Sequence, residues 1–408
     1  MTTVFRGSPL RLAGYTLLSF YLLAGIIYSC VLPAIGRFPD ERDYLALTGH
    51  LLSGPGFSLD GAHLTAIRPP GFAFFLFLFG DSIIAARIAQ IILIGAGILL
   101  LARLFPEKNR DSAVLFTTLT VAIYPLFFYT GTTLYPQTLA GFLFVLTLSL
   151  LLRGPRNLTM IALIGLIYGF LILVVPTFLL TLFVLLGAGI WVGIMRWHEA
   201  VIFTAAAAVI VLTWTVRNYI EFRQFVPVAS YSGAQLLIGN SENTIAYGGS
   251  GNIDTTHYHD EAQARGLDEF QADHFYQQAA LTWIEDHPAR AFVLYLEKAA
   301  NFFNVYNEYA PESRGEVTAW RQAVLGACYG ALLLLLLWRL AESGKYPLSS
   351  SEKLFLAIYI LSAFTQAIFF TRIRLRLPYD YLIVAIIAEH LALRLQPWLA
   401  SRGLTKST

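Results

Sequence analysis

The stretch that decides the fold covers residues 12–44 and reads LAGYTLLSFYLLAGIIYSCVLPAIGRFPDERDY. Its first part, residues 12–32, is predominantly apolar, and about twenty such residues are long enough to cross a bilayer as a helix. Arg6 and Arg11 precede it, and it lacks the small-residue cleavage pattern of a signal peptide. The stretch therefore predicts an uncleaved first transmembrane helix.

An acidic cluster, PDERDY at residues 39–44, follows this span directly. Carboxylates close to hydrocarbon are costly unless they face water or a partner, so the cluster predicts a functional site. If a helix begins here, Asp40 and Asp43 share one face and Glu41 points roughly 100° away from them. The alternative is that Asp40 is the N-cap and Asp43 a first-turn acid, which would stabilise the helix by about 1 kcal/mol.

The composition indicates more than one membrane span. Of 408 residues, 56% are hydrophobic and 13% are charged, whereas soluble domains are about 45–50% apolar. The net charge of +2 and the scattered basic residues exclude a nucleic-acid partner, which needs a concentrated Lys/Arg face. Cys30 and Cys328 lie inside apolar runs, which is typical of buried hydrophobic residues rather than of a disulfide or a zinc site.

The hydropathy pattern predicts an all-α polytopic membrane protein with about ten transmembrane helices. The spans are expected near residues 12–32, 82–104, 112–128, 137–152, 158–175, 177–194, 199–215, 318–338, 354–370 and 379–395. Lys and Arg recur in alternate connections, so by the positive-inside rule these connections and both termini are expected in the cytoplasm. The protein is expected in the cell inner (plasma) membrane, with the acidic cluster on the outer side.

The chain is expected to divide into three regions. Residues 1–216 form an N-terminal transmembrane region with a long first outer loop at 33–81, and residues 318–408 form a C-terminal transmembrane region. Residues 217–317 are too long for an ordinary loop and contain two amphipathic helical patterns, which predicts an extracytoplasmic loop region. A Gly-rich turn at 246–252 lacks the Lys-Ser/Thr of a phosphate loop, which argues against nucleotide binding.

Two groups of arginines are expected on the same outer side as the acidic cluster. In Arg68-Pro69-Pro70-Gly71 the prolines enforce an extended entry to an aromatic run that is too short to cross the membrane. Residues 371–380, TRIRLRLPYD, carry Arg372, Arg374 and Arg376 against the positive-inside bias. An anionic ligand is the simplest explanation for these charges.

Three weaker candidates lie elsewhere on this side. Arg217 and Asn218 close the seventh span, where an aromatic-belt anchor with a snorkelling arginine is the alternative. His63 in the first outer loop is a candidate substrate contact, with a solvated histidine as the alternative. Residues 254–261 include His257 and His259 among acids, but without the fixed spacing of a metal site.

Together these motifs resemble those of the polyprenyl-phosphate-sugar glycosyltransferases of the integral-membrane GT-C fold, relatives of protein O-mannosyltransferases and of the lipid A aminoarabinose transferase (glycosyltransferase family 39-like). The resemblance covers most of the chain and rests on the order of Asp40-Glu41, Arg68-Pro69-Pro70-Gly71, Phe79-Gly80, Arg87, Trp214, Arg217-Asn218, Gly239-Asn240 and Arg374-Leu375-Arg376-Leu377-Pro378. Relatives usually carry a second acidic residue near Gln137, and an amide binds divalent cations poorly. No cofactor is certain, and a divalent cation stays open.

The resemblance implies transfer of a sugar from a polyprenyl-phosphate donor to an extracytoplasmic acceptor, which is a glycolipid, a glycan or a protein. For that reaction Asp40 is the expected general base, with Glu41 orienting the acceptor or the base. Arginines are expected to stabilise the departing lipid phosphate, and direct displacement predicts inversion at the anomeric carbon. The predicted substrate-binding residues are Asp43, Tyr44, His63, Arg68, Arg217, Asn218, Arg372, Arg374 and Arg376, with Arg374 and Arg376 the leading phosphate ligands.

Three other functions are compatible with a polytopic chain. A GT-C enzyme that moves whole oligosaccharides is the nearest alternative. A lipid or sugar transporter would show ionisable residues at mid-membrane and paired broken helices in an internal repeat, and the sequence shows neither pattern. A membrane scaffold without catalysis would tolerate loss of the acidic cluster.

Overall fold

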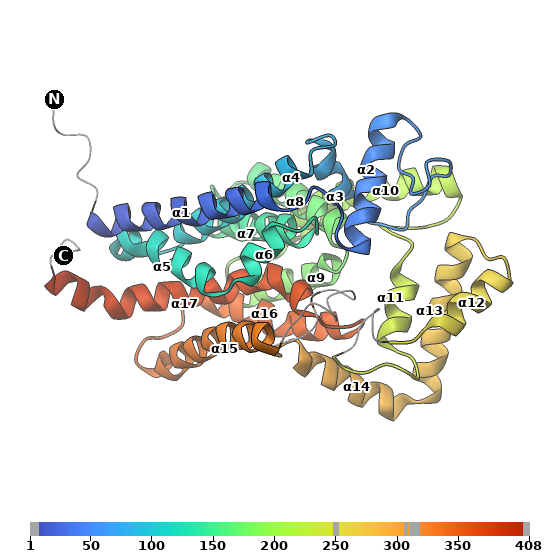
Figure 1. Ribbon diagram of the computed structural model, residues 1–408. Helices are drawn as coiled ribbons and strands as arrows, with labels where there is room; N and C mark the ends of the chain where they lie inside the picture. Colours follow the sequence, from blue (N-terminus) through green and yellow to red (C-terminus); the bar gives the residue numbers. More distant parts are fainter. Residues whose placement is uncertain (1–7, 248–252, 306–308, 310–318, 403–408) are drawn as a thin grey trace.

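The computed structural model describes residues 8–247, 253–305, 309 and 319–402 (Figure 1). Within these ranges the chain folds into helices without a named strand, and an isolated antiparallel bridge joins Ser58 to Leu64. The prediction of an all-α fold is confirmed. Most of the predicted Gly-rich turn at 246–252 lies outside the described residues.

Five described helices are long and apolar enough to cross a membrane, which confirms a multi-pass membrane protein. They are α1 (Pro9–Val31), α4 (Ile83–Ala102), α10 (Trp197–Phe222), α15 (Ala319–Ala341) and α17 (Ile373–Ser401). Shorter apolar helices are α7 (Gln137–Arg153), α8 (Leu158–Val174) and α9 (Phe178–Trp191). The remaining two predicted spans correspond to α5 (Arg110–Ile123) and α16 (Ser350–Ala367).

The long helices lie roughly side by side, and α1 begins at the same end of the bundle at which α17 ends (Figure 1). The short helices α2 (Pro39–Ser53), α3 (Pro70–Phe77) and α11 (Ser232–Gly239) gather at the opposite end, together with α12 (Thr256–Ala264), α13 (Glu269–Asp286) and α14 (Pro288–Asn301). The bundle also contains α6 (Leu126–Gly131) and the 3₁₀ turns η1 (Glu107–Asn109) and η3 (Glu342–Gly344).

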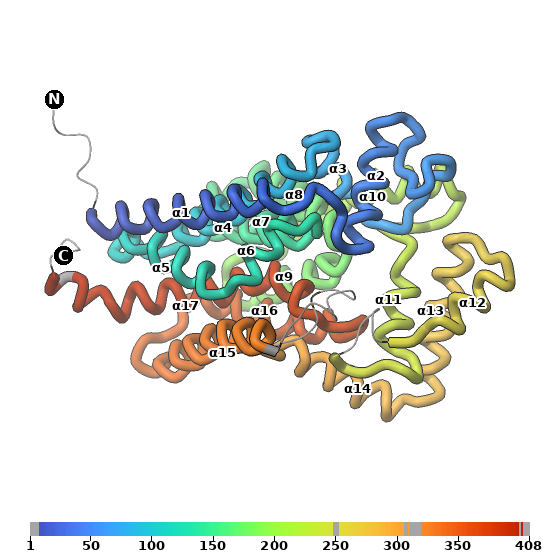
Figure 2. The backbone as a smooth tube through the Cα atoms, viewed as in Figure 1, coloured from blue at the N-terminus to red at the C-terminus, as the bar shows by residue number. Residues whose placement is uncertain are grey.

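The predicted region boundary at residue 216 falls inside α10, which continues to Phe222. The tube in Figure 2 follows the chain from there into the region that holds α11 to α14. The end of α10 is tied to the first loop, because Arg217 donates to the carbonyl of Thr65 across 3.1 Å. This contact places the predicted loop region beside residues 54–69, which connect α2 to α3.

Small residues let α8 and α10 pack closely within the bundle. Gly165 and Gly169 lie one turn apart on α8 and face the backbone of α10. A methyl group at Gly169 would lie only 2.5 Å from the carbonyl oxygen of Ala207, and one at Gly165 would meet the carbonyl of Phe203. Such small-residue pairs allow close backbone approach where lipid offers no hydrophobic driving force between helices.

We expect Gly169→Ile to destabilise the bundle, because the branched side chain must push α8 away from α10. The cost should be about 1–3 kcal/mol, as is typical of overpacking. The measurement is thermal unfolding of the purified protein in detergent, which should show a lower midpoint for the variant. Gly187→Ile is the matched control, because no atom lies within 4 Å of the position of a Cβ there. An equal midpoint for both variants would contradict this packing.

Candidate active site

The acidic cluster forms the first turn of α2, and Glu41 sets where that helix begins. Pro39 is the first helical residue, and the Glu41 carboxylate accepts from the backbone N–H groups of Phe38 (3.2 Å) and Arg37 (2.5 Å). Its other oxygen accepts from the N–H of Leu134 across 2.7 Å. Glu41 therefore both caps α2 and fastens it to the segment before α7, as a carboxylate at a helix start is suited to do.

Two sequence expectations change with this observation. The N-cap is Phe38 and the capping carboxylate is that of Glu41, so the interpretation of Asp40 as the N-cap is wrong. Glu41 is fully buried and bonds backbone N–H groups on both oxygens, which fits a positioning residue better than one that contacts an acceptor.

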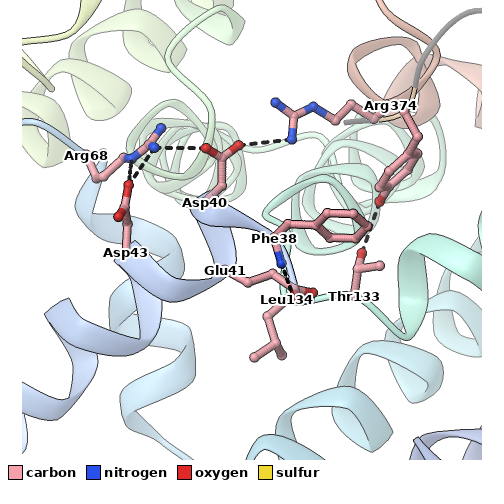
Figure 3. A network of polar contacts seen from close by, with 9 residues as sticks. Phe38, Asp40, Glu41, Asp43, Arg68, Thr133, Leu134 and Arg374 are labelled. Atoms are coloured by element: carbon pink, nitrogen blue, oxygen red, sulfur yellow. Dashed lines mark hydrogen bonds and ion pairs between the residues drawn. The ribbon is translucent and has the colours of Figure 1, made fainter. Parts of the chain in front are cut away.

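Asp40 and Asp43 lie on another face of α2 and bind arginines (Figure 3). The Asp40 carboxylate accepts from Arg68 Nη2 across 2.8 Å on one oxygen and from Arg374 Nη1 across 2.9 Å on the other. Arg68 also donates to Asp43 through Nε and Nη2, at 3.0 and 2.6 Å. The structure thus brings together four of the predicted residues from three distant segments. We call Asp40, Asp43, Arg68 and Arg374 the charge network.

Electrostatics keep Asp40 ionised in this network. Burial acts to raise the pKa of the Asp40 carboxyl, but the positive charges and hydrogen bonds of Arg374 and Arg68 outweigh it and lower the pKa below the ordinary 3.8. The pKa of Arg68 is raised, because the attraction of Asp40 and other neighbours exceeds the effect of its own burial. Asp40 is therefore a carboxylate able to accept a proton, and each of its oxygens meets a guanidinium.

Arg68 is positioned by the two prolines that follow it. Pro70 begins α3, and Gly71 lies against Leu173 and Val174 at the end of α8, where a methyl group would come within 2.8 Å of backbone atoms. The Arg68 guanidinium also lies 5.2 Å from the ring centre of Tyr231, a cation–π distance. The extended backbone predicted for the Arg-Pro-Pro-Gly motif thus positions Arg68 so that its side chain reaches α2.

Arg374 lies in the first turn of α17, and a buried lysine holds the loop before it. Lys298 on α14 donates to the carbonyl oxygens of Gly239 (2.7 Å) and Phe369 (2.9 Å), and Asn301 donates to Thr371 (2.9 Å to the hydroxyl). These bonds tie α14 and the end of α11 to residues 368–372. The ring of Tyr135 lies 4.5 Å from the Arg374 guanidinium.

Arg376 is separated from Arg374, although the sequence grouped them as phosphate ligands. It is 1% exposed, pairs with Asp380 and donates to the carbonyl oxygens of Phe302 and Asn304 at 2.6 and 2.8 Å. It also donates to the hydroxyl of Tyr124 across 3.0 Å. Arg376 thus bonds other parts of the bundle, whereas Arg374 binds Asp40, and the expected role of Arg376 as a phosphate ligand stays a prediction. Arg372 is buried next to Phe370, with its guanidinium 5.6 Å from that ring.

The other predicted residues lie around the charge network or farther from it. Tyr44 is buried against Phe72, and Arg217 stacks on Trp214 with its guanidinium 4.8 Å from the ring. The Asn218 side chain donates to the carbonyl of Val226 (2.9 Å) and also accepts from Arg217. His63 is exposed and pairs with Asp60 across 2.8 Å. Arg217 and Asn218 thus join α10 to the loops beside it.

The described residues contain no group of three or more His, Cys, Asp or Glu side chains arranged to hold a metal ion. The predicted group at residues 254–261 lies mostly on α12, where His257 pairs with Glu242 across 3.2 Å and His259 contacts the hydroxyl of Tyr276 across 2.9 Å. Gln137 is buried as the first residue of α7.

Sequence reasoning missed several residues that shape the site. Tyr135 and Tyr231 flank the two arginines, and Lys298 fixes the loop before Arg374. Lys298 has a signal in the sequence, because it is a charged residue among apolar ones on an amphipathic helix and it is completely buried in the structure. The sequence gives no signal for Tyr135 and Tyr231, because nothing distinguishes them from the other tyrosines among the 21 in the chain.

No family model matches the chain, and neither does any curated protein. Two crystal structures of ArnT from Cupriavidus metallidurans are similar to it. The structure bound to undecaprenyl phosphate has a TM-score of 0.44 and 12% identity, and the apo structure has 0.39 and 13%. Each match covers 95% of this chain and 80% of the ArnT chain.

The lowered pKa of Asp40 predicts a pH dependence of stability. A carboxyl whose folded pKa lies below its unfolded value contributes stability that is complete above the unfolded pKa and is lost as the pH falls through the folded one. We expect the midpoint advantage of the wild type over Asp40→Asn to be constant near pH 7 and to shrink as the pH falls below 3.8. Thermal unfolding in detergent across this range is the measurement. A pH-independent advantage would contradict the ion pairing.

Proposed function

We propose that this protein is a membrane glycosyltransferase of the GT-C type, which transfers a sugar from a polyprenyl-phosphate donor to an acceptor hydroxyl with inversion. The observation that supports the proposal is the charge network, in which an ionised Asp40 lies between Arg68 and Arg374 at one end of a membrane bundle. A carboxylate that takes the proton of the attacking hydroxyl and fixed guanidinium groups that stabilise the departing phosphate are suited to this displacement.

The two arginines are suited to a phosphate. Guanidinium groups bind phosphate and carboxylate oxygens through the same fork of N–H donors, so Asp40 occupies the place that a donor phosphate would compete for. Arg374 Nε and the hydroxyl of Tyr135 are buried and have no hydrogen-bond partner among the described residues. A phosphate oxygen between them would satisfy an unpaired donor on each side chain.

Donor binding would also prepare Asp40 for catalysis. When a phosphate takes over N–H groups of Arg374 and Arg68, the carboxylate loses the contacts that lower its pKa and becomes a stronger base. The acceptor oxygen then attacks the anomeric carbon, its proton passes to Asp40, and the bond from that carbon to the phosphate oxygen breaks. The polyprenyl phosphate leaves with the electron pair, and the arginines stabilise the charge it gains.

The position of the charge network supports a site on the outer side. It lies at the end of the bundle opposite to the start of α1 and the end of α17, as expected if both termini are cytoplasmic (Figure 1). The expected partners are then a polyprenyl-phosphate sugar, the bilayer and an extracytoplasmic acceptor.

Asp40→Asn tests the role of the base. We expect sugar transfer from a purified polyprenyl-phosphate sugar to an envelope glycolipid extract to fall at least about 100-fold, because the amide cannot take the proton. Binding of polyprenyl phosphate should persist, since the arginines remain. Asp81→Asn is the control, as Asp81 is an exposed acid in the loop after α3.

Product mass distinguishes transfer of one sugar from transfer of an oligosaccharide, and anomeric NMR tests inversion. Unchanged transfer by Asp40→Asn would contradict the role of Asp40 as the base, and absence of transfer by the wild type would favour a transporter or a scaffold.

Arg374→Gln tests stabilisation of the leaving group. We expect kcat to fall about 100- to 1,000-fold, as is typical when one donor to a developing negative charge is removed. Inhibition by added polyprenyl phosphate should weaken in the same variant. Arg290→Gln is the control, because Arg290 lies on the exposed face of α14 and pairs with Glu297 there. A rise in KM with unaltered kcat would contradict this role, because it would assign Arg374 to binding that is equally strong in the ground state and the transition state.

A further inference from the structure

A cavity of 390 Å³ lies beside the charge network, between the first loop and the helices α11 to α13. Its volume is at the small end of the roughly 300–1,000 Å³ that is usual for ligand sites. The loop contributes Asp60, His63 and Ile67, and the helices contribute Asp273 and Tyr276, among others. The chemistry proposed above does not use this cavity.

The walls of the cavity are joined to one another by partly buried polar contacts. Glu269 at the start of α13 accepts from the hydroxyl of Thr65 (2.5 Å) and the N–H of Ala66 (3.0 Å), and it also binds Ser230. Asp273 accepts from the N–H groups of Gly233 (2.8 Å) and Ala234 (3.1 Å), which fixes the start of α11. These contacts hold the first loop, α11 and α13 in place relative to one another, so the cavity between them has a fixed shape.

The polar groups of the lining define the kind of ligand. Carboxylates, hydroxyls and imidazoles line the cavity together with two tyrosines and several aliphatic residues, and the described lining residues include no Lys or Arg. An anion would meet the carboxylates of Asp60, Glu269 and Asp273, which disfavour negative charge in the cavity. A neutral saccharide fits instead, because its hydroxyls donate to carboxylates and its apolar ring faces pack on tyrosines.

One residue connects the cavity to the charge network. Tyr231 lines the cavity, and its ring also packs on the guanidinium of Arg68, which in turn binds Asp40. Ile67 lines the cavity immediately before Arg68 in the chain. A ligand held in the cavity is thus separated from the carboxylate by the side chains of Tyr231 and Arg68.

We propose that this cavity binds a neutral sugar ring of the acceptor, on the opposite side of Tyr231 and Arg68 from Asp40. The inference rests on the proposed function and adds to it the substrate class of the acceptor, a saccharide-bearing molecule. The proposal places the donor phosphate at Arg68 and Arg374 and the acceptor sugar in the cavity that carboxylates line.

Ala272→Trp tests the proposal by filling the cavity, which Ala272 lines from α13. Gln278→Trp is the matched control, because Gln278 is exposed on the same helix and does not line the cavity. With an envelope glycolipid extract as the acceptor, we expect Ala272→Trp to lower sugar transfer at least tenfold. Hydrolysis of the donor by water and binding of polyprenyl phosphate should equal those of the wild type. The control should match the wild type in all three measurements.

A second measurement does not depend on catalysis. Neutral disaccharides at millimolar concentration should raise the thermal midpoint of the wild type and of Gln278→Trp, but not that of Ala272→Trp. Ala272→Leu, a milder filling, replaces the tryptophan variant if the latter fails to fold. Normal transfer by a folded filled variant, with donor chemistry intact, overturns this inference and leaves the proposed function standing. If the wild type shows neither transfer nor hydrolysis, the proposed function is overturned. If, in addition, no disaccharide raises the thermal midpoint of the wild type, the assignment of the cavity as a sugar site is overturned as well.

Discussion

The carboxylate of Asp40, shared between Arg68 and Arg374, is the contact on which the arrangement of this end of the molecule depends. Arg68 lies 28 residues after Asp40 in the chain and Arg374 lies 334 residues after it. Two guanidinium groups brought this close repel each other unless an anion lies between them. One carboxylate therefore joins α2, the entry to α3 and the start of α17, and a phosphate is the other anion that this geometry would accept.

Each member of the charge network is held by a backbone contact outside it. Glu41 fastens α2 to the segment at Leu134, Gly71 allows α3 to approach α8, and Lys298 holds the loop before Arg374. Buried polar groups stabilise a fold only when their hydrogen-bond partners are in place. Each of these contacts therefore holds its helix or loop in one position relative to the rest of the bundle. The site is preorganised because helices and their caps, rather than flexible side chains alone, set the distances between charges.

The proposed division of substrates follows from the sign of the charges on the two sides of Tyr231. Arg68 and Arg374 offer guanidinium groups for which a donor phosphate would compete with Asp40, whereas the described lining of the cavity carries the carboxylates of Asp60, Glu269 and Asp273. A phosphate-bearing donor and a neutral sugar would therefore reach different sides of the same tyrosine. Asp40 stands near the boundary between them, where a proton must leave the acceptor as the phosphate departs.

Much of the fold and part of the site were predictable from the sequence, because they depend on local properties of the chain. Hydrophobic length predicts the spans, and the helical repeat predicts that Asp40 and Asp43 share a face that excludes Glu41, as their separate partners confirm. Basic residues against the positive-inside bias marked residues 371–380 as a candidate site, and Arg374 of that stretch lies in the first turn of α17.

Packing alone decided which of these charges meet. Arg374 and Arg376 are two residues apart, so on a helix they point about 200° apart, and the sequence does not say which of them faces α2. The roles of Glu41 as a helix anchor, of Lys298 as a loop clamp and of Tyr231 as a shared wall likewise depend on partners far along the chain. The sequence by itself determined a multi-pass helical membrane protein with an acidic turn after its first span. The tertiary structure decided the pairing of that turn with Arg68 and Arg374, because contacts between distant segments follow from how helices pack and not from any local pattern.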